Sequence, residues 1–371
     1  NQIRHVPYVL YHWRAIPGSV ALAPGEKHYA HERAREAIRE HLTRRKIEGA
    51  EVVPCFGSLH RVKYPLPKSP PKVSVIIPTR DRLDLMVRVL DGLWNKTDYP
   101  NLEIIVVDNQ SQEPETIERL TRWQDDGRIK LLSYSAPFNY SAINNYAVER
   151  ASGEVLVFLN NDIEIVESDW LKELVSFALR SEVGAVGAKL LYPDLTVQHA
   201  GIVTGIHGVA DHAERYLGKD HPGYFGRSQV IRSVSAASAA CLVVRKEVFN
   251  EVGGFESENL KVAYNDVDLC LRIRAKGYRI VQNNCVNLIH HESVSRGSDQ
   301  DAHHTHRFHQ ETNYMKEKWG RLLEEDPFFS PNLSLLSSDF RLAFPPLVAT
   351  PKSDSTGKLK PSVGRETSLS S

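Results

Sequence analysis

The sequence has few cysteines and no long apolar run, and its charges balance. Its four cysteines, Cys55, Cys241, Cys270 and Cys285, include no Cys-x-x-Cys pair, so the pattern predicts neither a zinc site nor a disulfide framework and favours a reducing compartment. No apolar run approaches the roughly 18 to 20 residues that cross a bilayer. Because 46 basic residues balance 46 acidic ones, no net field would recruit nucleic acid or an anionic membrane. We therefore expect neither a membrane span nor a nucleic-acid partner.

Proline content and changes of pattern divide the chain, whose 371 residues are enough for one large domain or two medium ones. Residues 65–71 are proline-dense and predict an extended polyproline II linker. The last residues have hardly an apolar side chain, which predicts a disordered tail. We expect an amino-terminal segment, the linker, a central domain with two halves, an extension and the tail, at 1–64, 65–71, 72–325 (72–182 and 183–325), 326–349 and 350–371.

The first half of the central domain alternates short apolar runs with helix-like segments, which is typical of a parallel sheet with crossover helices. The sequence therefore predicts a Rossmann-like α/β half-sheet that binds a nucleotide. In this half we expect strands at 73–77, 103–107, 129–133 and 154–159, and helices at 82–94, 114–123, 139–150 and 169–179. In the second half we expect shorter strands at 183–192, 197–204, 233–245, 279–281 and 286–289, and helices at 265–276 and 300–319.

The stretch 153–162, Gly-Glu-Val-Leu-Val-Phe-Leu-Asn-Asn-Asp, is the centre of this pattern. Its five central residues include no polar one, which favours a strand covered on both faces. Asn160, Asn161 and Asp162 follow at the carboxyl end, where ligands collect in open α/β sheets. Their oxygens suit a hard divalent cation such as Mg²⁺ or Mn²⁺. The alternative is that the three residues only cap the helix that follows.

Polar residues follow two other predicted strands as well. Thr79, Arg80 and Asp81 come after the first strand, and Asp108 and Asn109 come after the second. Because the carboxyl ends of parallel strands meet at one edge of a sheet, we expect these residues to lie near 160–162. Three polar strand ends at one edge indicate a shared binding site.

The order of motifs over residues 72 to 320 resembles the family 2 glycosyltransferases of GT-A fold, of the type found in bacterial O-antigen and cell-surface polysaccharide synthesis. The resemblance implies a mostly parallel Rossmann-like sheet with helices on both faces and a smaller acceptor-side half. Each motif is weak alone, and the combination is specific. The motifs are Val-Ser-Val-Ile-Ile-Pro-Thr-Arg-Asp-Arg at 73–82, Ile-Ile-Val-Val-Asp-Asn at 104–109, Asn-Asn-Asp at 160–162, Gly-Gly-Phe at 253–255, Asn-Asp-Val-Asp-Leu-Cys-Leu-Arg at 265–272 and His-His-Glu-Ser at 290–293.

The activity that this resemblance implies is an inverting, metal-dependent hexosyl or deoxyhexosyl transfer from a nucleotide-diphosphate sugar to a growing glycan or a lipid-linked glycan. It also implies a cytoplasmic site at the inner membrane face, with peripheral association with the membrane or with other glycosyltransferase modules. Residues 1–14 look like the end of a preceding module of the same kind.

The resemblance assigns donor-side roles at the strand ends. It places base recognition at Pro78, Thr79, Asp81 and Asp108, where the Asp108 carboxylate would accept the imide N–H of uracil or thymine. The alternative for Asp108 is a turn or helix cap. It makes Asp162 the metal ligand, which holds a cation against the leaving diphosphate.

The sequence departs from the family's Asp-x-Asp pattern, because Asn160 replaces the first acid. An amide at that position would hydrogen-bond the ribose, with Asn161 beside it. Asn139 and Asn144 belong to a helix whose amino-terminal N–H groups would face the donor, and Asn139 as a plain helix cap is the alternative.

The remaining assignments concern catalysis and the acceptor. Asp266 matches the family's general base, which takes the proton of the acceptor hydroxyl, whereas Asn265 replaces the usual Glu. Asp268 is expected to pair with Arg272, one helical turn on.

The resemblance implies a histidine at this strand end as a cation or pyrophosphate ligand, and we prefer His290 to His291 because it keeps the His-x-x-Ser spacing to Ser293. The alternative is that both histidines are structural. Arg296 would reach the diphosphate of a bound donor. The small residues that precede and include Ala240 and Cys241 would let an acceptor sugar approach, or would pack tightly within the protein.

Two functions from different classes remain open. One is an active glycosyltransferase, and the other is a catalytically silent GT-A-like module that binds a glycan or a partner within a larger synthase. A dinucleotide oxidoreductase is excluded, because Pro78-Thr79-Arg80 stands where the Gly-x-Gly-x-x-Gly turn would follow the first strand. Intact Asp162, Asp266 and His290 favour the active enzyme.

Overall fold

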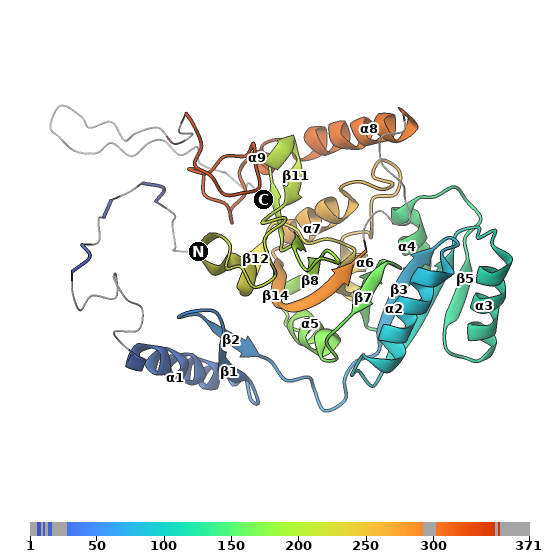
Figure 1. Ribbon diagram of the computed structural model, residues 1–371, viewed down its shortest axis with the longest axis horizontal. Coiled ribbons are helices and arrows are strands. Elements are labelled where there is room, and N and C mark those ends of the chain that lie inside the picture. Colours follow the sequence, from blue (N-terminus) through green and yellow to red (C-terminus); the bar gives the residue numbers. More distant parts are fainter. Residues whose placement is uncertain are drawn as a thin grey trace.

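The computed structural model describes residues 6–8, 10–11, 14–16, 28–291, 302–345 and 348 (Figure 1). Arg296, most of the 1–14 segment and the 350–371 tail lie outside the described residues, so the predictions made for them stay predictions. Among the helices of the described part, none combines the length and apolarity needed to cross a bilayer.

A single large sheet of ten strands organises the described chain. Its strand order is β12-β14-β8-β13-β6-β3-β4-β5, with β7 paired to β14 and β9 paired to β8. The four strands predicted from the alternating pattern lie side by side and parallel, as β5-β4-β3-β6. These four are β3 (Val73–Thr79), β4 (Leu102–Asp108), β5 (Lys130–Ser133) and β6 (Val155–Leu159). The predicted mostly parallel, Rossmann-like α/β half-sheet is therefore confirmed.

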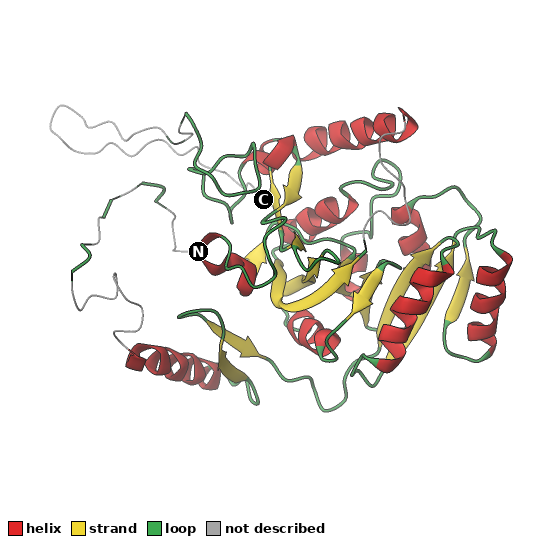
Figure 2. Cartoon of the chain, in the orientation of Figure 1, coloured by secondary structure: helices red, strands yellow, loops and turns green. Residues whose placement is uncertain are grey.

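Helices cover both faces of this sheet (Figure 2). Val155, Val157 and Leu159 of β6 point to one apolar core, and Leu156 and Phe158 point to the other, and all five are fully buried. Alternation along a strand sends successive side chains to opposite faces, so an unbroken apolar run is what a doubly covered strand requires. The first core is covered by α2 (Leu83–Asn95), α3 (Pro114–Asp125) and α5 (Trp170–Ala178). The second is covered by α4 (Tyr140–Arg150), α6 (Lys246–Glu251), α7 (Asn265–Ala275) and α8 (Ala302–Trp319).

The second half of the domain departs from the predicted strands in three places. The single strand expected at 233–245 is two strands, β12 (Ile231–Val234) and β13 (Cys241–Arg245), joined by a loop of small residues. The strand expected at 197–204 is divided into β9 (Val197–His199) and β10 (Ile202–Thr204), because Gly201 between them has φ of 113°.

The third departure is β14 (Arg279–His290), which is continuous where two strands were predicted. It runs parallel to β8 (Val183–Leu191) with a bulge between Asn283 and Asn287. Gln282 and Asn283 pair in register with β8, and the bulge takes up residues 284–286 so that one strand can continue past them. The outer end of β14 pairs with β7 (Ile163–Ile165), a short strand that the sequence pattern did not predict.

The amino-terminal segment forms α1 (His28–Arg44) and a hairpin of β1 (Glu51–Pro54) and β2 (His60–Lys63). The hairpin docks on α5, where Arg61 forms an ion pair with the nearly buried Glu173 at 2.9 Å and Lys63 approaches the same carboxylate at 3.3 Å. Further along, β10 pairs with β11 (Ala210–His212), and α9 (Arg321–Glu324) precedes the carboxyl-terminal extension.

Candidate functional site

Two adjacent cavities lie at the carboxyl edge of the parallel strands. The first, here the strand-end cavity, has a volume of about 390 Å³ and is lined by residues that follow β3, β4 and β6. The second, here the hairpin cavity, measures about 460 Å³ and lies between the β10–β11 hairpin and the start of α7. Four residues line both cavities: Tyr140, Asn160, Val262 and Phe308. A ligand in one cavity would therefore meet a ligand in the other beside Asn160.

The strand-end cavity collects most of the predicted strand-end residues. Pro78 and Thr79 line it from β3, and Asn160, Asn161 and Asp162 line it from the end of β6. The Asn161 amide donates to Thr79 Oγ1 at 3.1 Å and so ties the two strand ends together. The parallel register places Thr79 opposite Asp108, which explains why polar residues at separate strand ends arrive at one edge.

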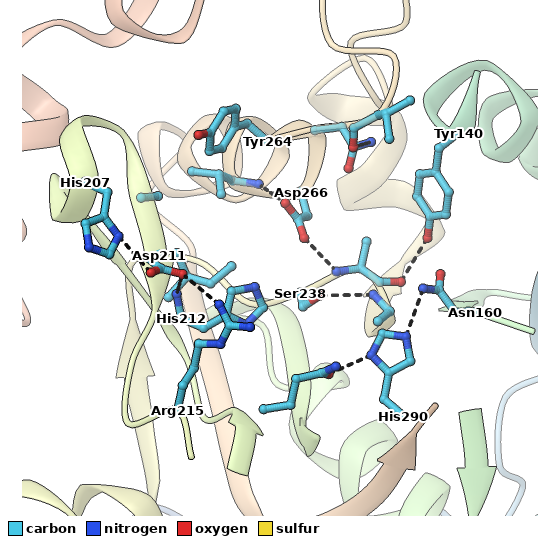
Figure 3. A pocket seen from close by; sticks show the side chains of 18 of the residues that line it. Tyr140, Asn160, His207, Asp211, His212, Arg215, Ser238, Tyr264, Asp266 and His290 are labelled. Atoms are coloured by element: carbon cyan, nitrogen blue, oxygen red, sulfur yellow. Dashed lines mark hydrogen bonds and ion pairs between the residues drawn. The ribbon is translucent and has the colours of Figure 1, made fainter. Parts of the chain in front are cut away.

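Asp162 and His290 form a close pair between neighbouring strand ends. Asp162 Oδ1 lies 3.0 Å from His290 Nε2, and both side chains are at least nine-tenths buried. The pairing of Ile163 in β7 with His290 in β14 creates this contact. The amide of Asn160 is 3.4 Å from the same ring nitrogen (Figure 3).

Gln198 orients the His290 ring from the other side. Its Oε1 lies 2.6 Å from His290 Nδ1, so the carbonyl oxygen accepts the Nδ1 proton. A histidine whose Nδ1–H is held in this way can offer Nε2 to a cation, and here Nε2 is directed toward Asp162. Among the described residues there is no cluster of three or more His, Cys, Asp or Glu side chains. The carboxylate and imidazole pair could therefore supply at most part of a cation's ligand shell, and its role as a metal site stays a prediction.

Asp266 stands at the wall of the hairpin cavity, at the first turn of α7 (Figure 3). Its Oδ2 accepts the Ala239 N–H at 3.0 Å and its Oδ1 accepts the Val267 N–H at 2.8 Å. These bonds fix the carboxylate's direction and leave each oxygen a lone pair. The side chain is only half-buried, so a carboxylate is held in place where a ligand can reach it.

Comparison with known proteins identifies the domain that holds these cavities. Residues 74–253 match the model of the glycosyl transferase family 2, which spans the strand-end residues and stops before Asp266 and His290. The chain contains a family 2 glycosyltransferase domain.

Relatives of this glycosyltransferase domain are considerably longer than the chain. It is 43% identical over 349 residues to the uncharacterized protein y4gI of Sinorhizobium fredii, a match that covers 93% of this chain and 38% of that protein. It is 41% identical over 342 residues to the O-antigen biosynthesis protein RfbC of Myxococcus xanthus, covering 91% of this chain and 26% of that protein. The chain therefore spans well under half the length of either relative.

A solved structure supports the GT-A fold of the glycosyltransferase domain. The crystal structure of GalNAc-T7 with UDP, GalNAc and Mn²⁺ superposes with a TM-score of 0.51 over 62% of this chain and 45% of that chain. The sequence identity is 14%, so the similarity is one of fold alone.

Several predicted donor residues of the glycosyltransferase site do not line either cavity among the described residues. Asp108 Oδ1 accepts the backbone N–H of Ser111 at 3.1 Å, and Asp81 Oδ1 accepts the N–H groups of Gln112 and Glu113 at 2.6 and 2.9 Å. Both carboxylates therefore hold the loop between β4 and α3. Their roles in base recognition stay predictions.

Asn139 and Asn144 also lie outside the cavity walls. The Asn139 side chain caps α4 by accepting the Ala142 N–H at 3.0 Å, as the alternative prediction had it, and its amide donates to Ser257 O at 2.8 Å. Asn144 is fully buried and donates to Tyr140 O at 2.8 Å. Donor binding by either residue stays a prediction.

On the acceptor side, Ala240 and Asn265 line the hairpin cavity, but Cys241 does not. Cys241 begins β13 and is buried in the core, and burial raises the pKa of its thiol well above the usual range. Asn265 is nearly buried and donates to Val262 O at 2.9 Å. Ala240 therefore faces the cavity and Cys241 packs within the protein, and acceptor binding at these small residues stays a prediction.

The predicted partner of Asp268 is confirmed, and the structure adds two more. Asp268 is fully buried and pairs with Arg272 Nε at 2.8 Å and Lys318 Nζ at 2.7 Å, while Trp319 Nε1 donates to it at 2.9 Å. This carboxylate therefore fastens the end of α8 to α7, the helix that carries Asp266.

Sequence reasoning assigned no role to many of the cavity residues, and four of these are polar or aromatic residues near the predicted ones: Asn109, Gln198, Arg307 and Phe308. Asn109 follows Asp108 directly and lines the strand-end cavity in its place. Gln198, Arg307 and Phe308 come from β9 and α8, and no motif points to them. The only available signal was for Asn109, whose position at a strand end had been noted without a role.

Proposed function

We propose that this chain is an inverting, metal-dependent glycosyltransferase that moves a sugar from a UDP- or dTDP-activated donor to a growing bacterial surface glycan. The observation that carries the proposal is the junction of two cavities beside Asn160. Asp162 and His290 stand close to that junction, and Asp266 stands on the wall of the second cavity. This layout supports donor binding in the strand-end cavity and acceptor binding in the hairpin cavity.

Asp162 and His290 are the residues that would hold a divalent cation. A carboxylate and an imidazole suit Mn²⁺ or Mg²⁺, which commonly take one or two protein ligands and complete their shell with substrate phosphates and water. The GalNAc-T7 structure, which has a similar fold, contains Mn²⁺ with UDP. When bound, such a cation would neutralise charge that develops on the diphosphate leaving group.

The preference for a pyrimidine donor rests on Asp108 and Asn109 at the end of β4. Asn109 Nδ2 donates to Tyr134 O at 3.0 Å and to Ala136 O at 2.9 Å, so the amide orientation is fixed. Its Oδ1 is buried and has no hydrogen-bond partner among the described residues. A buried acceptor on a cavity wall favours a ligand that brings an N–H, as the imide of uracil or thymine does.

Catalysis would depend on Asp266. Inverting transfer needs a base that removes the acceptor hydroxyl proton while the sugar carbon is attacked from the face opposite the leaving group. The backbone amides of Ala239 and Val267 hold the carboxylate in one direction, so its remaining lone pairs can accept that proton.

The polar side chains on the same wall, Ser238 and Asn265 among them, suit a hydroxyl-rich acceptor. The name of the relative RfbC supports a surface glycan as that acceptor.

Turnover of a panel of nucleotide sugars without acceptor tests this proposal. We expect slow hydrolysis of at least one UDP- or dTDP-sugar, its loss in excess chelator, and its recovery on adding Mn²⁺ or Mg²⁺. Full activity in excess chelator would contradict the metal assignment. If no nucleotide sugar turns over and no nucleoside diphosphate binds, the chain is a binding module and the proposal is wrong.

A further inference from the structure

Arg307 is a cationic side chain on the strand-end cavity that the proposed reaction has not yet used. It projects from α8 onto the same cavity as Asp162 and Arg80. Its side chain is 26% exposed, and its Nε is buried without a hydrogen-bond partner among the described residues. A buried N–H donor without an acceptor costs free energy, so a ligand that brings an acceptor to this guanidinium would gain by binding there.

The nearest carboxylate does not satisfy this guanidinium. Glu311 Oε2 lies 3.8 Å from Arg307 Nε, which is beyond hydrogen-bond distance. Both Glu311 oxygens instead accept backbone N–H groups, from Val262 and Ala263, at 3.0 Å each. Glu311 is 2% exposed, so it anchors α8 to the loop that leads into α7 and keeps Arg307 beside the cavity.

The charges around the strand-end cavity suit a diphosphate. Among its described lining residues, Asp162 is the acid and Arg80 and Arg307 are the strong bases. A divalent cation on Asp162 would make this wall more positive still. The planar fork of an arginine matches phosphate oxygens with two parallel N–H donors, and such charge-assisted bonds are stronger than neutral ones.

We propose that Arg307 binds the diphosphate of the nucleotide donor. The proposal rests on the proposed function, since it requires a nucleoside diphosphate in the strand-end cavity. It gives α8 a role in donor binding that no sequence motif indicated. It also distinguishes Arg307 from a surface arginine whose stem merely covers apolar neighbours.

Calorimetry with and without phosphates on the ligand tests this role. We expect Arg307→Gln to weaken UDP or dTDP binding about 10- to 100-fold in the presence of Mn²⁺. Binding of uridine or thymidine, measured by displacement, should stay unchanged because these nucleosides lack the diphosphate. Arg307→Lys keeps the charge and should retain part of the affinity. The matched control is Arg321→Gln on α9, whose exposed guanidinium pairs with Glu325 and lines neither cavity.

The possible results separate this inference from the proposed function. If the unsubstituted chain binds no nucleoside diphosphate, the proposed function fails and this inference fails with it. If UDP or dTDP binds and Arg307→Gln binds it equally well, only the role of Arg307 is wrong. Equal loss of nucleoside and diphosphate binding would also overturn the role, because it would indicate a distorted wall rather than a lost phosphate contact. If Arg307→Gln melts at a lower temperature than the control, Arg307→Lys becomes the deciding variant. The role of Arg307 is contradicted if Arg307→Lys binds UDP or dTDP no more tightly than it binds uridine or thymidine.

Discussion

The strand-end cavity and the hairpin cavity are neighbours, but the chain builds them in different ways. Half of the residues that line the first lie at or just after the ends of β3, β4 and β6, three parallel strands in register. The other half come from the start of α4, the loop before α7 and α8. The walls of the second come from β9, the β10–β11 hairpin, the loop at 235–240 and the start of α7. One is therefore a property of a regular sheet edge, and the other is assembled from short, irregular pieces.

This difference implies separate control of the two substrates. A sheet edge fixes its side chains through many backbone hydrogen bonds, so donor recognition should tolerate little change. A hairpin and a loop can change in length and sequence without disturbing the sheet, so acceptor recognition can vary between relatives. Tyr140 and Asn160, which line both cavities, are where the two substrates would meet.

The largest expected effect separates chemistry from donor binding. Asp266→Asn keeps the size of the side chain and removes its negative charge, so transfer should fall about 10²- to 10⁴-fold while UDP or dTDP affinity stays nearly unchanged. Steady-state transfer rates and calorimetry measure the two quantities. Asn265→Ala, at the neighbouring position, should cost far less. If Asp266→Asn transfers sugar at nearly the unsubstituted rate, Asp266 is not the general base, and the hairpin cavity does not supply the catalytic carboxylate in this way.

The next effect concerns the contact that orients His290. Gln198→Leu removes the carbonyl oxygen that accepts from Nδ1, and loss of such a partner typically weakens metal binding about 10- to 100-fold. Titration with Mn²⁺ in the presence of UDP measures the change. Gln229→Leu serves as the control, because the half-buried Gln229 lines neither cavity. Unchanged Mn²⁺ affinity would show that Gln198, and the wall of the hairpin cavity to which it belongs, does not contribute to metal binding.

A smaller effect tests which residue at the end of β4 reads the base. Asn109→Ala should weaken UDP or dTDP by about 0.5–1.5 kcal/mol, the usual value of a neutral hydrogen bond, and should leave GDP nearly unchanged. Asp108→Ala is the paired variant. A larger loss with Asp108→Ala would return base recognition to the residue that the sequence favoured. Equal or tighter binding of GDP by the unsubstituted chain would overturn the pyrimidine preference itself.

The smallest effect on either cavity is expected from removing the amino-terminal segment. A chain that begins at Tyr64 should melt cooperatively and bind UDP or dTDP as the full chain does, because 28–63 supplies no described wall residue of either cavity. Its melting temperature should fall, since Glu173 loses Arg61 and Lys63. An insoluble product would mean that the hairpin belongs to the core of the domain.

The sequence was sufficient where local pattern decides structure and insufficient where distant contacts do. The run Val155–Leu159 needed both its faces buried, so its place within the sheet could be predicted from composition alone. The break at 235–240 could not be predicted, because its small residues suit a strand and a tight loop equally. Short β7 has three residues, and only its pairing with β14 makes it a strand.

The same contrast holds for the site. Asp162 and Asp266 were predicted because a motif surrounds each of them. Gln198 and Arg307 reach the cavity residues only through contacts between segments far apart in sequence, so no local pattern contains them. Asp108 was preferred for base recognition at its strand end, and its bond to Ser111, three residues on, is the turn contact that was given as the alternative.

The pairing of β14 with both β8 and β7 has a consequence for the order of folding. Asn160 and His290 are 130 residues apart in sequence, and they meet only when the last strand has entered the sheet. Contacts of such long separation form late, because closing the intervening chain costs entropy before the contact returns any stability. Affinity for Mn²⁺ should therefore rise only in the final phase of refolding. A cation bound there would stabilise the completed sheet over every earlier intermediate.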